Sequence, residues 1–474
     1  MRGTAEVPRL WGPSKRGSVP ARLGLADGAG GVDWPASDRP PISKPPHAIQ
    51  VALKTILRRV QDFTGFIVKS VLLREGSGRA QVDVHLAPDP RHRRRCSCCQ
   101  RPAPIHDTLG TRTWSFVPLW GLAVIFHYAP RRITCPLTGN ATVEHMPWNV
   151  GKHRQTRAHM IYLAQWAKLL SWKKTAQIFR TSWDTVHRCV QWVVAWGLEN
   201  RTLEGVEAIG VDELHWGRGK KSGNFVTVIY QLDAGARRLL WVGRKRTEAT
   251  LKLGFSTLEK AHQGFLKNLK VVCSDMWKPY LKVIASQASA ALNVLDRFHI
   301  AQHLNAAVDT VRRGEQSRLR ADVAKKTVKR GRFLLLKRGS RVRGKARAKL
   351  NAMLRSLRQT ARAWELKESF EQFWRYKSPI WAGAFLDVWV HQALRSRIAP
   401  LQKVARMLRT HDDLLLNYFR ARKQFSNAVT EGLNHKARAS LAGSYGHRSF
   451  EVLQLVLYHR LGNLPEPPQT HKFC

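Results

Sequence analysis

Hydrophobic and polar positions alternate with different periods along the chain and divide it into blocks. Residues 1–48 show no apolar period and are rich in proline and glycine, which predicts a disordered tail. The pattern then favours an amphipathic helix at Ile49–Gln61 and a strand pair at Phe66–Leu73 and Ala80–Leu86. We therefore expect a small α/β segment over residues 49–94.

The block at residues 148–204 has helical spacing throughout. A helix at Ala158–Leu170 is followed by a short helix, Trp172–Phe179, a polar break and a longer helix, Trp183–Leu198. This order is typical of a helix-turn-helix, whose second helix enters the major groove of DNA, although a helical hairpin in a protein core has the same pattern. The candidate DNA-contacting residues of the second helix are Ser182, Asp184, Thr185, His187 and Arg188.

The block at residues 205–310 changes to strand-like runs separated by turns. Helical stretches at Glu248–His262 and Pro279–Ala288 give the order β-β-β-α-β-α-β. Three consecutive strands followed by alternating helices and strands are typical of a ribonuclease-H-like core. The expected strands are Val206–Val211, Phe225–Leu232, Arg237–Val242, Leu269–Cys273 and Ala291–Leu295.

Long helical patterns follow and predict an inserted all-α domain over residues 311–420. The core is then completed over residues 421–474. The fold class that we expect is multidomain α+β: a ribonuclease-H-like α/β core with a large helical insertion, preceded by a small zinc-finger-like domain and a helix-turn-helix. The expected helices of the insertion are Leu350–Phe373, Trp381–Ile398 and Leu401–Phe419.

Positive charge makes DNA the expected partner. The chain has 80 Lys and Arg against 33 Asp and Glu, a formal net charge of +47, and such a field attracts a polyanion. The segment Arg312–Lys349 alone holds 16 basic residues against two acidic ones, which favours phosphate contact over a merely solvated face. Its candidate phosphate-binding residues are Arg330, Arg332, Lys337 and Arg338.

Nothing in the pattern indicates a membrane partner. The longest uncharged apolar stretch, Ser115–Pro130, is shorter than the roughly 18 residues that a spanning helix needs. No signal peptide is visible at the amino terminus. We expect a cytoplasmic, nucleoid-associated bacterial protein that acts on double-stranded DNA as a homo-oligomer.

Cysteines near residue 100 have the spacing of metal ligands. Cys96 and Cys99 form a Cys-x-x-Cys pair, and Cys135 follows 36 residues after Cys99. Tetrahedral Zn²⁺ takes four thiolate or imidazole ligands, so a fourth ligand is needed. A zinc-finger-like domain is expected over residues 95–147, and a metal-free knuckle is the alternative. The open candidates for the fourth ligand are Cys98, His106 and His145.

Carboxylates stand where a ribonuclease-H-like core holds its catalytic acids. Asp212 ends the first strand, Asp275 follows the fourth strand and Glu431 opens a late helix. Oxygen ligands on separate elements suit two Mg²⁺ or Mn²⁺ ions. Asp296, at the end of the fifth strand, is the alternative to Asp275. Arg438 lies two helical turns after Glu431 and is a candidate for a DNA phosphate.

Several long motifs in a fixed order resemble the ISL3 family of Asp-Asp-Glu (DDE) insertion-sequence transposases. The likeness runs from about Leu53 to Pro467 and implies an N-terminal zinc finger, a helix-turn-helix, and DNA cleavage and strand transfer at terminal inverted repeats. The motifs are Ile209–Gly219, Cys273–Lys278, Leu295–Ile300 and Glu431–Lys436.

Two departures from the family pattern leave a second function open. Thr138 stands where the pattern has a cysteine, and Ala439–Ala442 is less basic than expected after the acidic helix. The alternative is therefore a catalytically decayed or domesticated sequence-specific DNA-binding protein. A nuclease on the same fold is disfavoured because the finger and the helix-turn-helix would be unexplained.

Overall fold

The structure is a computed structural model that describes residues 53–75, 80–216, 224–319, 331–424, 428–442 and 449–468. The expected tail over residues 1–48, the glycine-rich end of the first motif at 217–219 and Arg330 lie outside the described residues. No described helix has the length and apolar character needed to cross a lipid bilayer.

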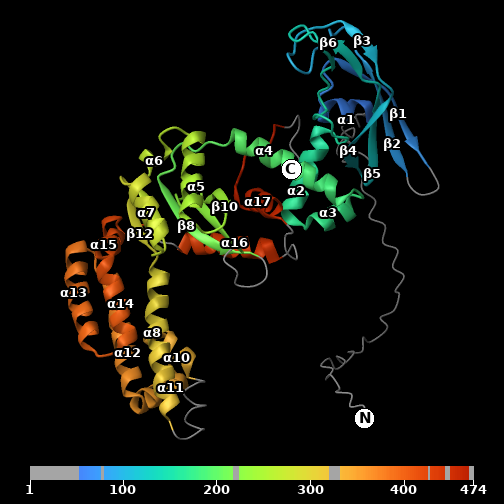
Figure 1. Cartoon of the computed structure of the whole chain (residues 1–474). Coiled ribbons are helices and arrows are strands. Elements are labelled where there is room, and N and C mark those ends of the chain that lie inside the picture. The colour runs from blue at the N-terminus through green and yellow to red at the C-terminus, as the bar shows by residue number, and fades with distance from the viewer. Residues whose placement is uncertain are drawn as a thin grey trace, which may run out of the picture. The chain divides into compact units, whose positions relative to one another are not determined.

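The first part of the described chain is built on two small sheets (Figure 1). A four-stranded sheet has the order β1-β2-β5-β4, and a three-stranded sheet has the order β3-β6-β7. The first sheet pairs strands from both sides of the boundary expected at residue 95, so the structure does not divide the chain there. The elements of this part of the chain are α1 (Leu53–Val60), β1 (Phe66–Arg74), β2 (Gln81–Pro88), β3 (Ile105–Thr108), β4 (Arg112–Leu119), β5 (Leu122–Tyr128), β6 (Arg131–Thr134) and β7 (Ala141–Val143).

Three helices follow with the expected pattern: α2 (Arg157–Leu169), α3 (Trp172–Ile178) and α4 (Trp183–Asn200). Each begins after a hydroxyl side chain that accepts a hydrogen bond from a backbone N–H of the first turn. The cap at Ser182 fixes the point at which the turn after α3 ends and α4 begins. The three capping residues are Thr156, Ser171 and Ser182.

A five-stranded sheet with the order β10-β9-β8-β11-β12 forms the centre of the following segment (Figure 1). The first three strands are antiparallel neighbours, whereas β11 runs parallel to both β8 and β12. The order of elements is the β-β-β-α-β-α-β order expected from the sequence, with one additional short helix, α6, before β11. The elements are β8 (Ala208–His215), β9 (Phe225–Gln231), β10 (Arg238–Arg244), α5 (Glu248–Ala261), α6 (Phe265–Asn268), β11 (Val271–Ser274), α7 (Lys278–Gln287) and β12 (Leu292–Leu295).

Helices cover both faces of this sheet. On one face, α5 and α7 pack over a buried cluster that includes Ile209 and Val211 of β8. On the other face lie α16 (Ala428–Ala442) and α17 (Phe450–Leu461), so residues from the end of the chain complete the core, as expected. Gly210 permits the close approach of α16 to β8, because a Cβ at this position would collide with the Thr430 hydroxyl.

The inserted helical domain begins earlier than residue 311, because α8 (Arg297–Arg318) starts directly after β12 and leads out of the core. Two of the expected helices are each divided, at Leu357 and at His411. The Glu315 carboxylate of α8 accepts hydrogen bonds from the backbone N–H groups of Gln359 and Thr360, which starts a new helix there. The remaining elements are α10 (Arg332–Leu336), α11 (Gly344–Ser356), α12 (Arg358–Phe370), α13 (Pro379–Arg395), α14 (Ala399–Thr410), α15 (Asp412–Arg420) and the short turns η2 (Gly339–Arg341) and η3 (Phe373–Arg375).

Candidate active site

Asp275 and Asp296 directly follow β11 and β12, whereas Asp212 lies inside β8, the parallel neighbour of β11, and not at the end of that strand as the sequence predicted. The register pairs Cys273 with Gly210 and Ser274 with Leu295. Extending it by one step beyond Ser274 brings Asp275 level with Asp212 on one side and Asp296 on the other. Because level residues of parallel strands point to the same face, the sheet gathers these carboxylates at one edge.

Glu431 reaches the same region from α16. This helix is tied to β8 by Asn434, whose side-chain amide donates to the Asp212 carboxylate at 2.7 Å. The Tyr230 hydroxyl of β9 donates in turn to the Asn434 side-chain oxygen at 2.9 Å. This buried chain of hydrogen bonds fixes Asp212 relative to the helix that carries Glu431.

A cavity of about 930 Å³ is lined by three of the four acids, Asp212, Asp296 and Glu431. Asp275 does not line it. Glu213 and Arg438 also line it, so Arg438 shares a face of α16 with Glu431, as its spacing predicts. The cavity therefore includes the alternative second acid, whereas the strand order places the preferred acid, Asp275, immediately beside Asp212.

The two candidates for the second acid differ in what holds them. The Asp296 carboxylate caps α8 by accepting the Phe298 N–H at 2.8 Å, and the side chain is almost fully buried. The Asp275 carboxylate accepts the Trp277 N–H at 3.1 Å and is only partly buried. Asp296 thus has a structural task in starting α8 that is independent of any ligand.

Burial and neighbouring negative charges raise the pKa of Asp212, Asp275 and Glu431. Burial, together with the charges of Asp275 and Asp296, raises the pKa of Asp212 to about 6. Burial and the Asp296 charge raise the pKa of Glu431 as well. The same causes raise the pKa of Asp275. His299, which lies 3.6 Å from Asp296, offsets part of the repulsion. A cation at this edge would relieve the rest.

The chemistry of the donor set fits a hard divalent cation. All four side chains offer carboxylate oxygens, which Mg²⁺ and Mn²⁺ prefer. The Oε1 atom of Glu431 is buried and has no hydrogen-bond partner among the described residues. Within the described ranges, no three acidic side chains bring ligand atoms within 4.8 Å of one another. An ion bound here therefore needs additional oxygen ligands, such as a phosphate.

Sequence reasoning did not assign three residues that support these acids. Asn434 and His299 lie inside the motifs given above; the contact of Asn434 joins α16 to the distant Asp212, whereas His299 contacts Asp296, which lies three residues earlier at the start of α8. Arg246 forms an ion pair with Glu213, and its guanidinium lies 4.5 Å from the centre of the Trp277 ring. No spacing signal in the sequence connects Arg246 to this site.

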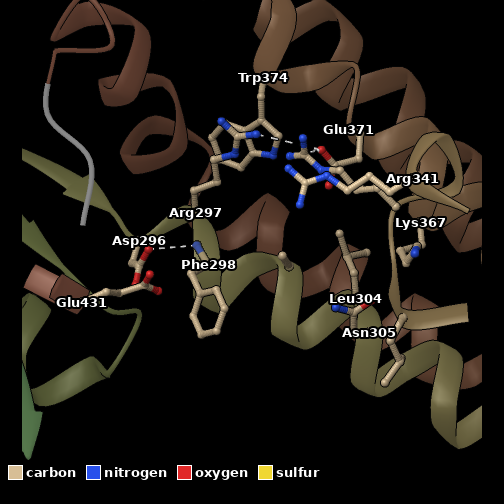
Figure 2. Close-up of a pocket in the computed structure, with 13 residues that line it drawn as sticks. Asp296, Arg297, Phe298, Leu304, Asn305, Arg341, Lys367, Glu371, Trp374 and Glu431 are labelled. Atoms are coloured by element: carbon tan, nitrogen blue, oxygen red, sulfur yellow. Dashed lines mark hydrogen bonds and ion pairs between the residues drawn. The ribbon is translucent and has the colours of Figure 1, made fainter. Parts of the chain in front are cut away.

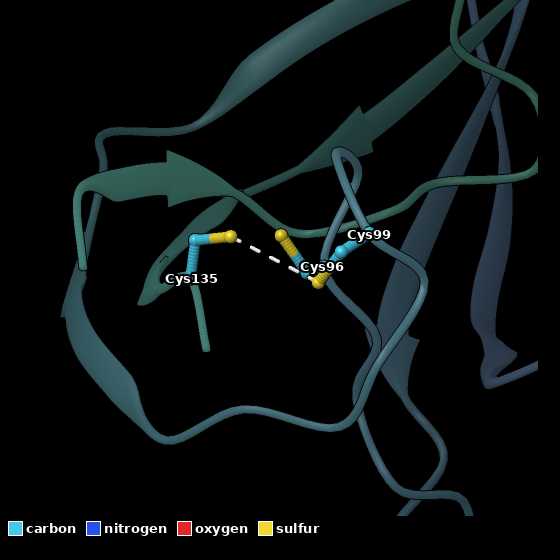
Figure 3. A group of neighbouring side chains, drawn as sticks. All are labelled: Cys96, Cys99 and Cys135. Carbon is cyan, nitrogen blue, oxygen red and sulfur yellow. Dashed lines mark hydrogen bonds between the residues drawn. The ribbon is translucent and has the colours of Figure 1, made fainter. Parts of the chain in front are cut away.

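The three cysteines predicted to bind zinc do come together (Figure 3). The sulfur atoms of Cys96, Cys99 and Cys135 all lie within 4.8 Å of one another, and Figure 3 shows them directed toward a common point. The cluster lies beside the three-stranded sheet, where Cys96 pairs with Glu144 and Cys135 follows β6. Three converging thiols are a partial set of ligands for Zn²⁺.

Thr138 occupies the neighbourhood of the missing fourth ligand. Its hydroxyl donates to the Cys135 sulfur, and this contact, with backbone N–H groups of Leu137 and Thr138, lowers the pKa of the Cys135 thiol to about 6. None of the three substitute ligands left open by the sequence belongs to the cluster: Cys98, His106 and His145.

The start of α4 offers fewer DNA-facing side chains than its sequence predicts. Asp184 and Arg188 are exposed, and His187 stacks on Trp183 with ring centres 5.1 Å apart. Thr185 is buried, and its hydroxyl pairs with that of Ser182 at 2.9 Å. Thr185 thus does not face DNA, because its backbone N–H and its hydroxyl both contact Ser182, the residue that caps α4.

The three described residues of the insertion that are candidates for phosphate binding, Arg332, Lys337 and Arg338, are exposed but differ in their partners. Arg332 lies 3.4 Å from Asp309, and Arg338 forms an ion pair with Glu371 at 2.7 Å. Lys337 is exposed and has no ion-pair partner within the described residues. The free positive charge of this segment is therefore smaller than its composition suggests.

Comparison with known proteins places these features in a family. The family model of ISL3-type DDE proteins, whose description is "Transposase", matches residues 209–457, a range that includes all four acids. The transposase for insertion sequence element IS1001 of Bordetella parapertussis is 24% identical over 407 residues, which cover 85% of this chain and 97% of that protein. The solved Drosophila P element transposase strand transfer complex covers 66% of this chain and 92% of the matched chain, with a TM-score of 0.34 and 10% identity, too low to relate the folds.

Proposed function

Since the chain belongs to the ISL3 family of DDE transposases, we propose that it binds the ends of an insertion sequence and cleaves and transfers DNA strands there. In this proposal Asp212, Asp275 and Glu431 are the catalytic acids of a ribonuclease-H-like core. The gathering of buried, mutually repelling carboxylates at one sheet edge is the observation that carries it. Two Mg²⁺ or Mn²⁺ ions, when bound, would activate the attacking oxygen and stabilise the leaving one.

The protein's own residues would hold and orient the DNA. Asn434 fixes the Asp212 carboxylate, and Arg438 on the same face as Glu431 offers a cation for a phosphate. Buried acids in a site of low dielectric constant bind a cation more strongly than acids in water do. The alternative of a decayed DNA-binding protein has less support, because every acid of the family pattern is present in this chain.

Asparagine variants separate the two candidates for the second acid. Asp275→Asn should abolish cleavage, because an amide cannot replace a charged metal ligand. Asp296→Asn should retain part of the activity, because asparagine also accepts the N–H that caps α8. Cleavage of a duplex containing an insertion-sequence end in Mg²⁺, with melting temperatures as a folding control, measures both. If Asp275→Asn retained activity and Asp296→Asn lost it, Asp296 would be the second catalytic acid.

Salt dependence tests the proposed contact between the helical insertion and DNA phosphates. Replacing Lys337, Arg341 and Arg343 with glutamine should flatten the plot of log K against log salt by roughly 0.9 per lost phosphate contact. The matched control replaces Lys260, Lys267 and Lys282 with glutamine and so removes the same amount of charge. These lysines lie on α5, α6 and α7, on the opposite face of the sheet from α16. Equal slopes for the two triple variants would mean that the insertion does not contact DNA.

A further inference from the structure

A second cavity, of about 600 Å³, opens next to the acids, between α8 and other helices of the inserted domain (Figure 2). Asp296, Phe298 and Glu431 line both this cavity and the first one. The two cavities are therefore neighbours, and Phe298 lies between them. Figure 2 shows Asp296 and Glu431 on one side of the second cavity and Trp374 and Glu371 on another.

The cationic wall of the second cavity is held rigidly by α12. Gly339 donates its backbone N–H to the Glu368 carboxylate at 2.7 Å. The buried Lys367 ammonium donates to the carbonyl oxygens of Leu335 and Lys337. These contacts anchor the loop that carries Arg338 and Arg341. A loop fixed in this way presents its cations without a large ordering cost on binding.

One cation of this wall is free for a ligand. The Arg338 guanidinium pairs with Glu371, whereas Arg341 has no ion pair or side-chain hydrogen bond with any described residue. Arg297 is already engaged, because its guanidinium lies 5.1 Å from the centre of the Trp374 ring. Arg341 is thus the group in this cavity best suited to a phosphate.

Phe298 is the aromatic group with an open face. Its side chain is 51% exposed, although it stands in the first turn of α8 between two polar cavities. Its backbone N–H is bonded to the Asp296 carboxylate, so the backbone that carries the ring is held beside the acids. An exposed aromatic ring in a charged cavity is suited to stacking on a flat ring of a ligand.

We infer that this cavity receives one unstacked nucleotide of the DNA strand that is cut, with its base stacked on Phe298 and its phosphate bound by Arg341. The inference rests on the proposed function, because it requires DNA at the neighbouring acids. Drawing a nucleotide out of the duplex costs stacking energy, which the ring and the cation offset. Phe298 and Arg341 are positioning residues here, since they act by holding the strand beside the acids.

Removal of the base from the DNA tests the role of Phe298. Phe298→Ala should slow single-turnover cleavage roughly 5- to 150-fold, the range expected for one lost base–aromatic stack. A duplex with an abasic nucleotide at the receiving position, found by scanning the positions that flank the cut, should restore most of this loss. Phe298→Tyr should cleave like wild type. The control is Phe333→Ala, because Phe333 on α10 is also exposed but lines neither cavity.

The results distinguish a failure of this inference from a failure of the proposed function. Wild-type cleavage together with an unimpaired Phe298→Ala variant, or a defect that no abasic position restores, would overturn the inference and leave the proposed function intact. Failure of the folded wild type to cleave would overturn the proposed function first.

A second experiment tests the role of Arg341. A neutral methylphosphonate at the same nucleotide should slow the wild type but not Arg341→Gln. Arg355→Gln on α11, the control, should respond like wild type, because Arg355 is exposed and lines neither cavity, and an equal response of all three proteins would also overturn the inference.

Discussion

Glu431→Gln is expected to eliminate DNA cleavage while leaving the affinity for insertion-sequence ends within a few-fold of wild type. Glutamine has the same size but cannot supply a negative oxygen to a metal ion. Even losing a group that only supports a metal ligand costs roughly 10- to 100-fold in activity, so losing a ligand should cost more. Glu431 is also the acid with a buried oxygen that lacks a hydrogen-bond partner within the described residues, so the substitution breaks no observed contact of that oxygen.

The measurement combines single-turnover cleavage in Mg²⁺ with a binding titration on the same duplex. Glu451→Gln on α17 is the matched control, because Glu451 is exposed and lines neither cavity. We expect this control to behave as wild type. A Glu431→Gln protein that cleaves normally would remove Glu431 from the catalytic set, and one that loses binding and stability together would show a structural role instead.

Thr138→Cys is expected to convert a partial zinc site into a closed one. The wild type offers three converging thiols, and the Thr138 hydroxyl already contacts the Cys135 sulfur, so a thiol at residue 138 would stand beside the cluster. Structural zinc sites normally close all four positions. Loss of a residue that only hydrogen-bonds to a metal ligand lowers metal affinity roughly 10- to 100-fold, so the gain of a fourth ligand should raise zinc affinity by at least as much. Because metal binding at such a site contributes folding free energy, melting in the presence of zinc should also shift upward.

The control for this variant adds a thiol nearby that does not face the cluster. Leu137 is 65% exposed, so Leu137→Cys should leave zinc content and stability unchanged. Metal analysis and thermal melting of the purified proteins give the answer. Full occupancy and equal stability in wild type and Thr138→Cys would mean that another group already completes the site.

The core could be predicted because its signals are local. The strands are short apolar runs bounded by turns, and the helices of the helix-turn-helix begin at hydroxyl residues that cap them. Asp275 follows from the same logic, because it directly follows a strand whose place in the sheet the order of elements determines, whereas Asp212 lies inside β8, which continues to His215.

What the sequence missed depends on contacts between distant residues. The division of the helix expected at Leu350–Phe373 arises from Glu315, which caps the new helix from α8. The four-stranded sheet joins β2 to β5 across the expected domain boundary, and parallel pairing leaves no turn signal between them. Asn434 supports Asp212 from 222 residues away, which no periodicity reveals.

The central claim is that acids at one edge of the sheet bind divalent ions in contact with the phosphate that is cut. A phosphorothioate at the scissile position tests it directly, since sulfur binds Mg²⁺ poorly and Mn²⁺ better. We predict that the wild type cleaves the normal duplex in either ion, fails on the phosphorothioate in Mg²⁺ and recovers in Mn²⁺. Equal cleavage of both duplexes in Mg²⁺, or cleavage in chelator without any divalent ion, would contradict the account.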